Sequence, residues 1–318
     1  MFWKKFVITL FIFILILLYR AYVVFTPDKT IFEPCSSTND NHSLEFHEQR
    51  LRTFQTLLQF QTISYEENNQ NFTELKRCRN FIKQHYDDLI TKYSKFVQLH
   101  DIAEYSLLYE IRGKNSNLKP FLLSAHFDVV PTGNLSPQKP GTNALQRTTS
   151  AVTLISGGEK ENILPTSASA TINHRIHTAD SCQKILENNR RIINDDRIVP
   201  RVKNCVEPSP SSPYGKDVYS YRIIEQTIRQ TFDKDRQPII VVPGLMLGAT
   251  DSRSYTNLSK NLYRFSPFIY HHDDLDRLHG DNERMTHLDV QRGLNFYFHL
   301  IVNNQLGHIP ESKLNTEL

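Results

Sequence analysis

The residue pair best suited to chemistry is His126 and Asp128, in the apolar run FLLSAHFDVVP of residues 121–131. We expect this run to form a buried strand, in which side chains two positions apart lie on the same side. His126 could bind a metal while Asp128 accepts a hydrogen bond from its other ring nitrogen, or the two could form an acid/base pair. The alternative is a structural histidine near a strand end, and these two residues alone leave the choice open.

A second histidine, His279, lies in the segment RLHGDNERM ahead of an expected helix. It could complete a mononuclear or dinuclear zinc site. The preceding segment GATDSRSYTNLSKNLYRFSP, residues 248–267, reads as a glycine-containing loop with an acidic residue and an arginine, followed by a strand. The alternative for His279 is a loop histidine beside a helix cap.

Hydrophobic periodicity predicts the elements that would position these residues. Apolar residues recur at helical spacing over residues 46–58, 75–89, 181–193, 217–231 and 285–302. Strand-like runs cover residues 96–99, 105–111, 121–125, 151–155, 167–176, 198–202, 239–242 and 261–265. We expect Thr178 or Asp180 to cap the helix that begins at residue 181. Strands and helices in this order predict an α/β protein with a smaller α+β unit.

The N-terminal 25 residues suggest a membrane anchor. Lys4 and Lys5 precede an uncharged run over residues 6–19, and apolar residues resume after Arg20. The segment could cross a bilayer if Arg20 reaches the interface. No motif for signal cleavage follows, so we expect an uncleaved signal-anchor with the rest of the chain lumenal or extracellular. The alternative is a cleaved signal peptide and a secreted chain.

Composition restricts the remaining possibilities. The 318 residues are 39% hydrophobic, enough for two domains with real cores. The 37 basic and 34 acidic residues are scattered and give a net charge of +3, which argues against a nucleic-acid surface. Sequence motifs that permit N-glycosylation occur at Asn41, Asn71, Asn134 and Asn257.

The four cysteines, Cys35, Cys78, Cys182 and Cys205, have neither zinc-site nor redox-motif spacing. Cys182 and Cys205 could pair within one small domain. They could equally be free buried thiols.

Four segments, taken in order, resemble motifs of the zinc-dependent aminoacylase / carboxypeptidase S family of clan MH. They are LLSAHFDVVP, ENILPTSASATINHRIH, GATDSRSYTNLSKNLYRFSP and RLHGDNE. The resemblance runs from Leu44 to about Asn303 but omits the middle. It implies a zinc-exopeptidase-like α/β/α catalytic domain, incomplete here, with a smaller α+β lid domain. It also implies two zinc ions, a substrate with a free carboxylate and a homodimer formed through the lid.

Combined with the composition, the resemblance divides the chain into five parts. We expect a signal-anchor at residues 1–25, a linker at 26–43, the first part of the catalytic domain at 44–141, the lid at 142–207 and the second part of the catalytic domain at 208–305.

The family's metal-site residues carry over by position. His126 matches the histidine ligand of one zinc ion, and His279 resembles the histidine ligand of the other. Asp128 matches the carboxylate that orients the site behind His126.

The family's substrate-binding residues carry over in the same way. In the lid, Asn162 and Arg175 match residues that hold the substrate near its carboxylate. The loop beside the scissile bond is represented by Gly248, Thr250 and Asp251, although Ala249 replaces the usual glycine or asparagine.

The main departure from the family lies between the two halves. The family places there an aspartate that bridges two zincs, two further acidic ligands, a glutamate general base and a lid histidine. Residues 129–158 contain no Asp or Glu, and Pro131 and Asn162 are only 31 positions apart. Two histidines, with one aspartate that only orients His126, would hold zinc weakly, because paired zinc ions need an anionic bridge. Replacement ligands would have to come from Glu159, Glu161 or the segment HHDD at 271–274.

Two functions remain open. The first is a zinc-dependent hydrolase acting on N-acyl amino acids or on C-terminal peptide bonds, its missing acids supplied from elsewhere. The second is a catalytically inactive truncated form (a splice product, an error in the gene model or a pseudoenzyme) that acts at most as a binding protein. With no residue available as general base, we expect the chain as written to be inactive.

Overall fold

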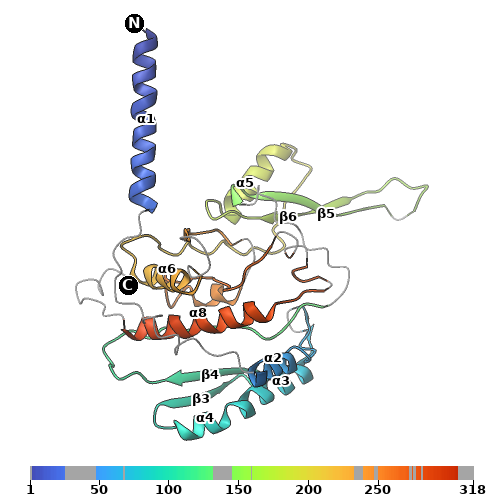
Figure 1. The fold of residues 1–318 in the computed structure, drawn as a ribbon. Helices are drawn as coiled ribbons and strands as arrows, with labels where there is room; N and C mark the ends of the chain where they lie inside the picture. The colour runs from blue at the N-terminus through green and yellow to red at the C-terminus, as the bar shows by residue number, and fades with distance from the viewer. Residues whose placement is uncertain are drawn as a thin grey trace.

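The computed structural model (Figure 1) describes residues 2–25, 48–66, 69–131, 145–158, 160–232, 239–246, 250–271, 274, 277–280 and 282–306. The first half of the chain contains α1 (Phe2–Phe25), α2 (Glu48–Leu57), β1 (Ser64–Glu66), β2 (Asn69–Gln70), α3 (Phe72–His85), α4 (Asp87–Lys92), β3 (Val97–Ile102) and β4 (Ser106–Ile111). The second half contains β5 (Thr149–Gly157), β6 (Ala168–Arg175), α5 (Cys182–Ile193), α6 (Tyr219–Phe232), the 3-10 helix η4 (Asp251–Tyr255) and α8 (His287–Leu306).

Within the described residues the strands form three separate two-stranded antiparallel sheets, β1–β2, β3–β4 and β5–β6. Each sheet joins strands that are neighbours in sequence, so little loop-closure entropy is lost when it forms. In the longest of them, β5–β6, Thr149 lies opposite Arg175 and Gly157 lies opposite Ala168. The general prediction of a mixed α/β protein is therefore confirmed.

Four of the predicted strands are wrong. Residues 121–125, 198–202, 239–242 and 261–265 carry no strand pairing. An apolar run becomes a strand only when another strand satisfies its backbone hydrogen bonds, and apolar periodicity reports burial rather than pairing. Near the first of these runs the only pairing in the described residues is a parallel bridge between Ile63 and Val129.

Helix α3 contacts the β3–β4 hairpin. The Asn71 side chain caps α3 by accepting a hydrogen bond from the Glu74 backbone N–H at 3.3 Å. Asp101 of β3 forms ion pairs with two residues of α3. One is with Arg79, and the other is with Lys83 at 2.8 Å. Cys78 of α3 is buried, with 2% of its surface exposed.

The main hydrophobic core of the second half lies between α6 and α8, which pack against each other (Figure 1). Its buried members are Ile223, Ile228, Phe296 and Leu300. Full burial of such a side chain stabilises a fold by about 1.5–3 kcal/mol. The same interface buries polar groups, since Asn303 donates to Thr227 Oγ1 at 3.0 Å.

Helix α5 begins at Cys182, one residue after the predicted start at residue 181. Its cap is Ser181, whose hydroxyl accepts a hydrogen bond from the Lys184 N–H at 3.3 Å. The prediction of Thr178 or Asp180 is wrong because the Asp180 carboxylate instead accepts a hydrogen bond from the Thr148 hydroxyl. That contact links the start of α5 to the start of β5.

The predicted membrane anchor is contradicted. None of the helices in the described part of the chain is long and apolar enough to cross a membrane. The uncharged run of residues 6–19 ends at Arg20. At about 1.5 Å per residue this run rises about 21 Å, less than the ~30 Å of a bilayer's hydrocarbon core. The predictions of a transmembrane helix and of a membrane location are therefore wrong. The predicted membrane partner has no support from the described helices.

Candidate functional site

The predicted pair of His126 and Asp128 forms a direct contact. The Nδ1 atom of His126 lies 2.9 Å from Oδ1 of Asp128 and 3.0 Å from the Asp128 backbone oxygen. With Nδ1 protonated and donating to the carboxylate, Nε2 keeps its lone pair for another partner. This is the arrangement in which a carboxylate orients a metal-binding histidine.

Thr62 and its neighbours hold this segment in place although it is not part of a sheet. The buried Thr62 hydroxyl donates to the Phe127 carbonyl at 2.5 Å, and the Val129 N–H donates to the Thr62 carbonyl at 2.9 Å. These two bonds fix the backbone on both sides of Asp128.

Solvent reaches both members of the pair. The His126 side chain is 62% exposed and the Asp128 side chain 41% exposed. Water and salt screen a charge interaction at such exposure, so the pair contributes little to folding, on the order of 1 kcal/mol or less. Its value lies in orienting the imidazole.

His279 lies in a turn that ends before α8. Its backbone φ is 58°, a left-handed conformation uncommon for a residue other than glycine. Its backbone N–H donates to Glu283 Oε2 at 3.3 Å, and its side chain is exposed.

The predicted zinc ligands do not complete a metal site among the described residues. The ligating atoms of His126, Asp128 and His279 do not form a group of three within 4.8 Å of one another. The described residues therefore supply one oriented imidazole but not the three protein ligands that catalytic zinc usually takes. No step of a reaction is assigned to a metal at this position.

The two predicted lid residues lie far apart. Arg175 is the last residue of β6 and faces Thr149 at the open end of the β5–β6 hairpin. Asn162 is an exposed residue of the connection beyond Gly157, at the closed end. At about 3.4 Å per residue the strands separate these ends by about 24 Å. One carboxylate cannot contact both residues within a single hairpin.

The loop predicted to lie beside the scissile bond is described in part. Gly248 lies outside the described residues. Thr250 occupies the cap position of η4, and its carbonyl accepts a hydrogen bond from the Arg253 N–H at 3.2 Å. Asp251 is the first residue of η4 and is exposed.

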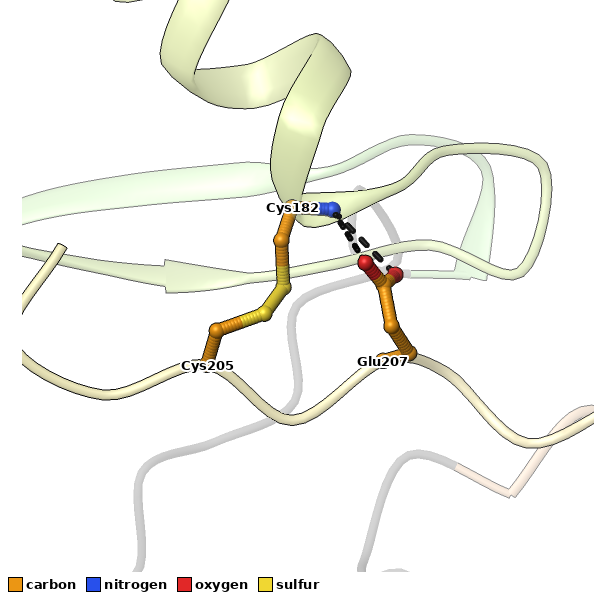
Figure 2. Close-up of side chains that lie close together, drawn as sticks. All are labelled: Cys182, Cys205 and Glu207. Atoms are coloured by element: carbon orange, nitrogen blue, oxygen red, sulfur yellow. Dashed lines mark hydrogen bonds between the residues drawn. A yellow bond between two sulfur atoms is a disulfide. The ribbon is translucent and has the colours of Figure 1, made fainter.

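A second group of residues with side chains that can bind metals lies at the start of α5, and the sequence predicted only part of it. Cys182 and Cys205 form a disulfide, and Glu207 lies beside them (Figure 2). The pairing of the two cysteines was one of the alternatives that the sequence left open. Glu207 was missed, and its position two residues after Cys205 was the signal available.

A family model named "Peptidase dimerisation domain", of the M20 group, matches residues 75–197. The chain is 37% identical over 209 residues to "Probable carboxypeptidase S-like 2" of Dictyostelium discoideum, covering 64% of this chain and 39% of that protein. It is 38% identical over 177 residues to "N-fatty-acyl-amino acid synthase/hydrolase PM20D1" of Xenopus tropicalis, covering 56% of this chain and 34% of that protein. These matches support the assignment of the chain to the M20 peptidase family. The resemblance read from the motifs is thus confirmed.

The chain is similar to only part of each relative. A third relative, "Putative carboxypeptidase YOL153C" of Saccharomyces cerevisiae, is 32% identical over 198 residues, covering 53% of this chain and 34% of that protein. The matched part thus spans between about a third and two fifths of the curated relatives' length. No solved structure matches the chain.

Proposed function

We propose that the chain is built on the plan of a zinc-dependent amide hydrolase acting on N-acyl amino acids or on C-terminal peptide bonds. The hydrogen bond between His126 and Asp128 carries this proposal, because it is the contact by which a carboxylate orients a metal-binding imidazole. The names of the relatives support the substrate class. In this proposal His126 and His279 are zinc ligands, and Asp128 is the residue that positions His126.

Substrate binding is assigned to the lid and to the loop that precedes η4. Arg175 is proposed to bind the substrate carboxylate, since a guanidinium matches a carboxylate with paired hydrogen bonds. Asn162, at the other end of the hairpin, is proposed to contact a separate part of the substrate. Residues proposed to line the scissile bond are Gly248, Thr250 and Asp251.

The proposal includes a loss of catalytic power. Residues 129–158 contain no Asp or Glu, so the chain lacks the bridging carboxylate and the general base that the family places in this region. Two zinc ions repel each other without an anionic bridge, and a water cannot be deprotonated without a nearby base. We propose that the chain binds zinc weakly and turns over substrate negligibly.

A second function follows from the same observation. A catalytically inactive form could still bind a partner through the predicted lid, of which residues 142–197 fall within the match to the dimerisation model. Leu154 and Ile155 of β5 are 63% and 80% exposed, and exposed apolar groups of this kind favour association. We propose that the partner is a second copy of this chain, joined through β5–β6 and α5.

The experiment for the hydrolase proposal measures zinc binding and substrate binding separately. Zinc is titrated into the full chain and into the variants His126→Ala and Asp128→Asn. Both variants are expected to weaken zinc binding, with about a 10–100-fold loss for Asp128→Asn. Equal affinity in all three proteins would contradict the assignment of His126 as a ligand.

Substrate binding is tested with an N-fatty-acyl amino acid and the same compound as its methyl ester. Arg175→Ala is expected to weaken binding of the free acid at least tenfold and to leave the ester unaffected. Arg201→Ala, at an exposed position outside the hairpin, is the matched control. If Arg175→Ala weakens both compounds equally, the arginine does not bind the carboxylate.

Two measurements address the inactive alternative. Sequencing transcripts across the codons for residues 131–140 asks whether a longer form encodes an aspartate and a glutamate pair in this region. Sedimentation of the full chain and of Ile155→Glu tests the dimer. We expect a dimer that the substitution dissociates, and a monomeric wild-type chain would rule out association through the lid.

A further inference from the structure

The disulfide between Cys182 and Cys205 joins the first residue of α5 to the segment that follows the helix. Its two Cα atoms are 6.3 Å apart. Both carboxylate oxygens of Glu207 lie 3.2 Å from the Cys182 backbone nitrogen, so the same short segment returns a second group to the start of α5 (Figure 2). Two sulfurs and one carboxylate therefore meet at one helix terminus.

These three side chains form a ligand group of their own. The Sγ atoms of Cys182 and Cys205 and a carboxylate oxygen of Glu207 lie within 4.8 Å of one another. Across the residues that the structure describes, this is the only group of three or more His, Cys, Asp or Glu side chains with that property. Cys182 is half-buried, whereas Cys205 and Glu207 are exposed, so the group is accessible from solvent.

In the disulfide form the sulfurs are not metal ligands, because the ligand is the thiolate. Reduction by a small dithiol breaks the S–S bond. The dithiol gives up two electrons and two protons and becomes its own disulfide, while Cys182 and Cys205 each gain one proton. A divalent metal then displaces those two protons when it binds.

Cys182 is the first residue of a 12-residue helix, where the backbone N–H groups and the helix dipole can interact with negatively charged groups. Glu207 already accepts a hydrogen bond there. One of its oxygens can stay on the Cys182 N–H while the other binds a metal, and a ligating carboxylate is commonly oriented in this way.

The spacing suits zinc. At Zn–S bonds of about 2.3 Å and tetrahedral angles, two thiolates lie about 3.8 Å apart, farther than in a disulfide but compatible with the same backbone. Two thiolates and a carboxylate give three protein ligands and leave a fourth position for water. Thiolates favour zinc over magnesium or calcium, which prefer oxygen ligands.

We propose that reduction of the Cys182–Cys205 disulfide creates a three-ligand zinc site completed by Glu207. This site is separate from the His126 region and does not depend on the proposed hydrolase function. The disulfide and the zinc complex are alternative ways of fixing the start of α5 to the segment after it.

The test uses the full chain carrying His126→Ala, His279→Ala and Cys35→Ser, so that neither the predicted catalytic ligands nor Cys35 contributes. The protein is reduced with dithiothreitol, freed of it under nitrogen and titrated with zinc against a chromophoric chelator. The reduced chain is expected to bind one zinc ion, at least 100-fold more tightly than the oxidised chain. Cobalt in place of zinc is expected to give a thiolate charge-transfer band only after reduction.

Two further variants separate a built site from simple thiol binding. Glu207→Gln retains both cysteines and is expected to weaken zinc binding at least tenfold. Glu187→Gln, on the exposed face of α5, is the matched control and is expected to have no effect. Cys205→Ser is expected to reduce the cobalt band, with circular dichroism used to verify folding.

The proposal is overturned if the reduced chain binds no more zinc than the oxidised chain. It is also overturned if Glu207→Gln binds zinc as tightly as Glu187→Gln, because the carboxylate is then not a ligand. In either case the Cys182–Cys205 pair acts only as a covalent clamp. Neither result bears on zinc binding at His126.

Discussion

His126 Nδ1 contacts Asp128 Oδ1 at 2.9 Å although the segment that carries both residues forms no strand. The contact is local, because the two residues are separated by one position. Completion of a metal site is not local, since it requires carboxylates from other strands. The described residues contain the local contact between His126 and Asp128 but no metal site completed around it.

The polar contact between α6 and α8 should be important for stability. Asn303 and Thr227 are fully buried, and Asn303 also donates to Gln230 Oε1 at 3.0 Å. Replacing Asn303 with alanine removes both bonds and leaves a cavity, so we expect a loss of about 2–3 kcal/mol in the free energy of unfolding, measured by urea denaturation. Asn304→Ala, whose side chain donates only within α8, should cost less than about 1 kcal/mol.

A double-mutant cycle separates the hydrogen bond from the cavity. Thr227→Val keeps the shape of the side chain while removing its hydroxyl. Combined with Asn303→Ala, it should show a coupling energy of about 1 kcal/mol. Strict additivity would mean that the two side chains do not interact.

Tyr109 should make stability depend on alkaline pH. Burial raises the pKa of its hydroxyl, and the nearby Tyr86 raises it further. Because the pKa of Tyr109 is higher in the folded state, its contribution to stability is complete below the unfolded-state pKa near 10. The contribution is lost as the pH rises through the folded-state pKa. Tyr109→Phe should therefore lose less stability than wild type between pH 8 and pH 11 in urea unfolding.

At pH 8 Tyr109→Phe should not lower the free energy of unfolding. The Tyr109 hydroxyl is buried without a hydrogen-bond partner among the described residues. Its removal should leave stability unchanged or increase it by up to about 1 kcal/mol. The exposed Tyr93 provides the control Tyr93→Phe. A loss of stability in Tyr109→Phe larger than in the control would show that the hydroxyl has a partner.

The disulfide should stabilise the region around α5 mainly by restricting the unfolded chain. The two cysteines are separated by 23 positions, and closing a loop of this size contributes about 3 kcal/mol. The double variant Cys182→Ser/Cys205→Ser should lower the free energy of unfolding by about that amount in metal-free buffer. Dithiol treatment of the wild-type chain should lower it by a similar amount, and unchanged stability in both would contradict the pairing.

The sequence predicted the local elements and missed those that depend on distant partners. Helices near residues 46–58 and 181–193 and the hairpins around 96–111 and 151–176 are present because their periodicity and hydrogen bonds are satisfied by neighbours in sequence. The run 121–125 has the same apolar character but has no partner strand, so it stays unpaired.

In the candidate site, too, local contacts could be predicted and contacts with distant residues could not. The contact of Asp128 with His126 could be predicted from their spacing on an extended backbone. The separation of Arg175 from Asn162 could not, since it depends on the register of β5 against β6. The cap of α5 was misplaced because Asp180 bonds to Thr148, which is remote in sequence. Neither feature leaves a signal in the local pattern.

We propose that this chain lacks the carboxylates and the general base needed for amide hydrolysis. The most direct measurement compares initial rates of N-fatty-acyl amino acid hydrolysis by the full chain and by His126→Ala, both with zinc supplied. We predict that both rates equal that of zinc in buffer alone. A wild-type rate well above buffer that falls to the buffer rate in His126→Ala would contradict the claim.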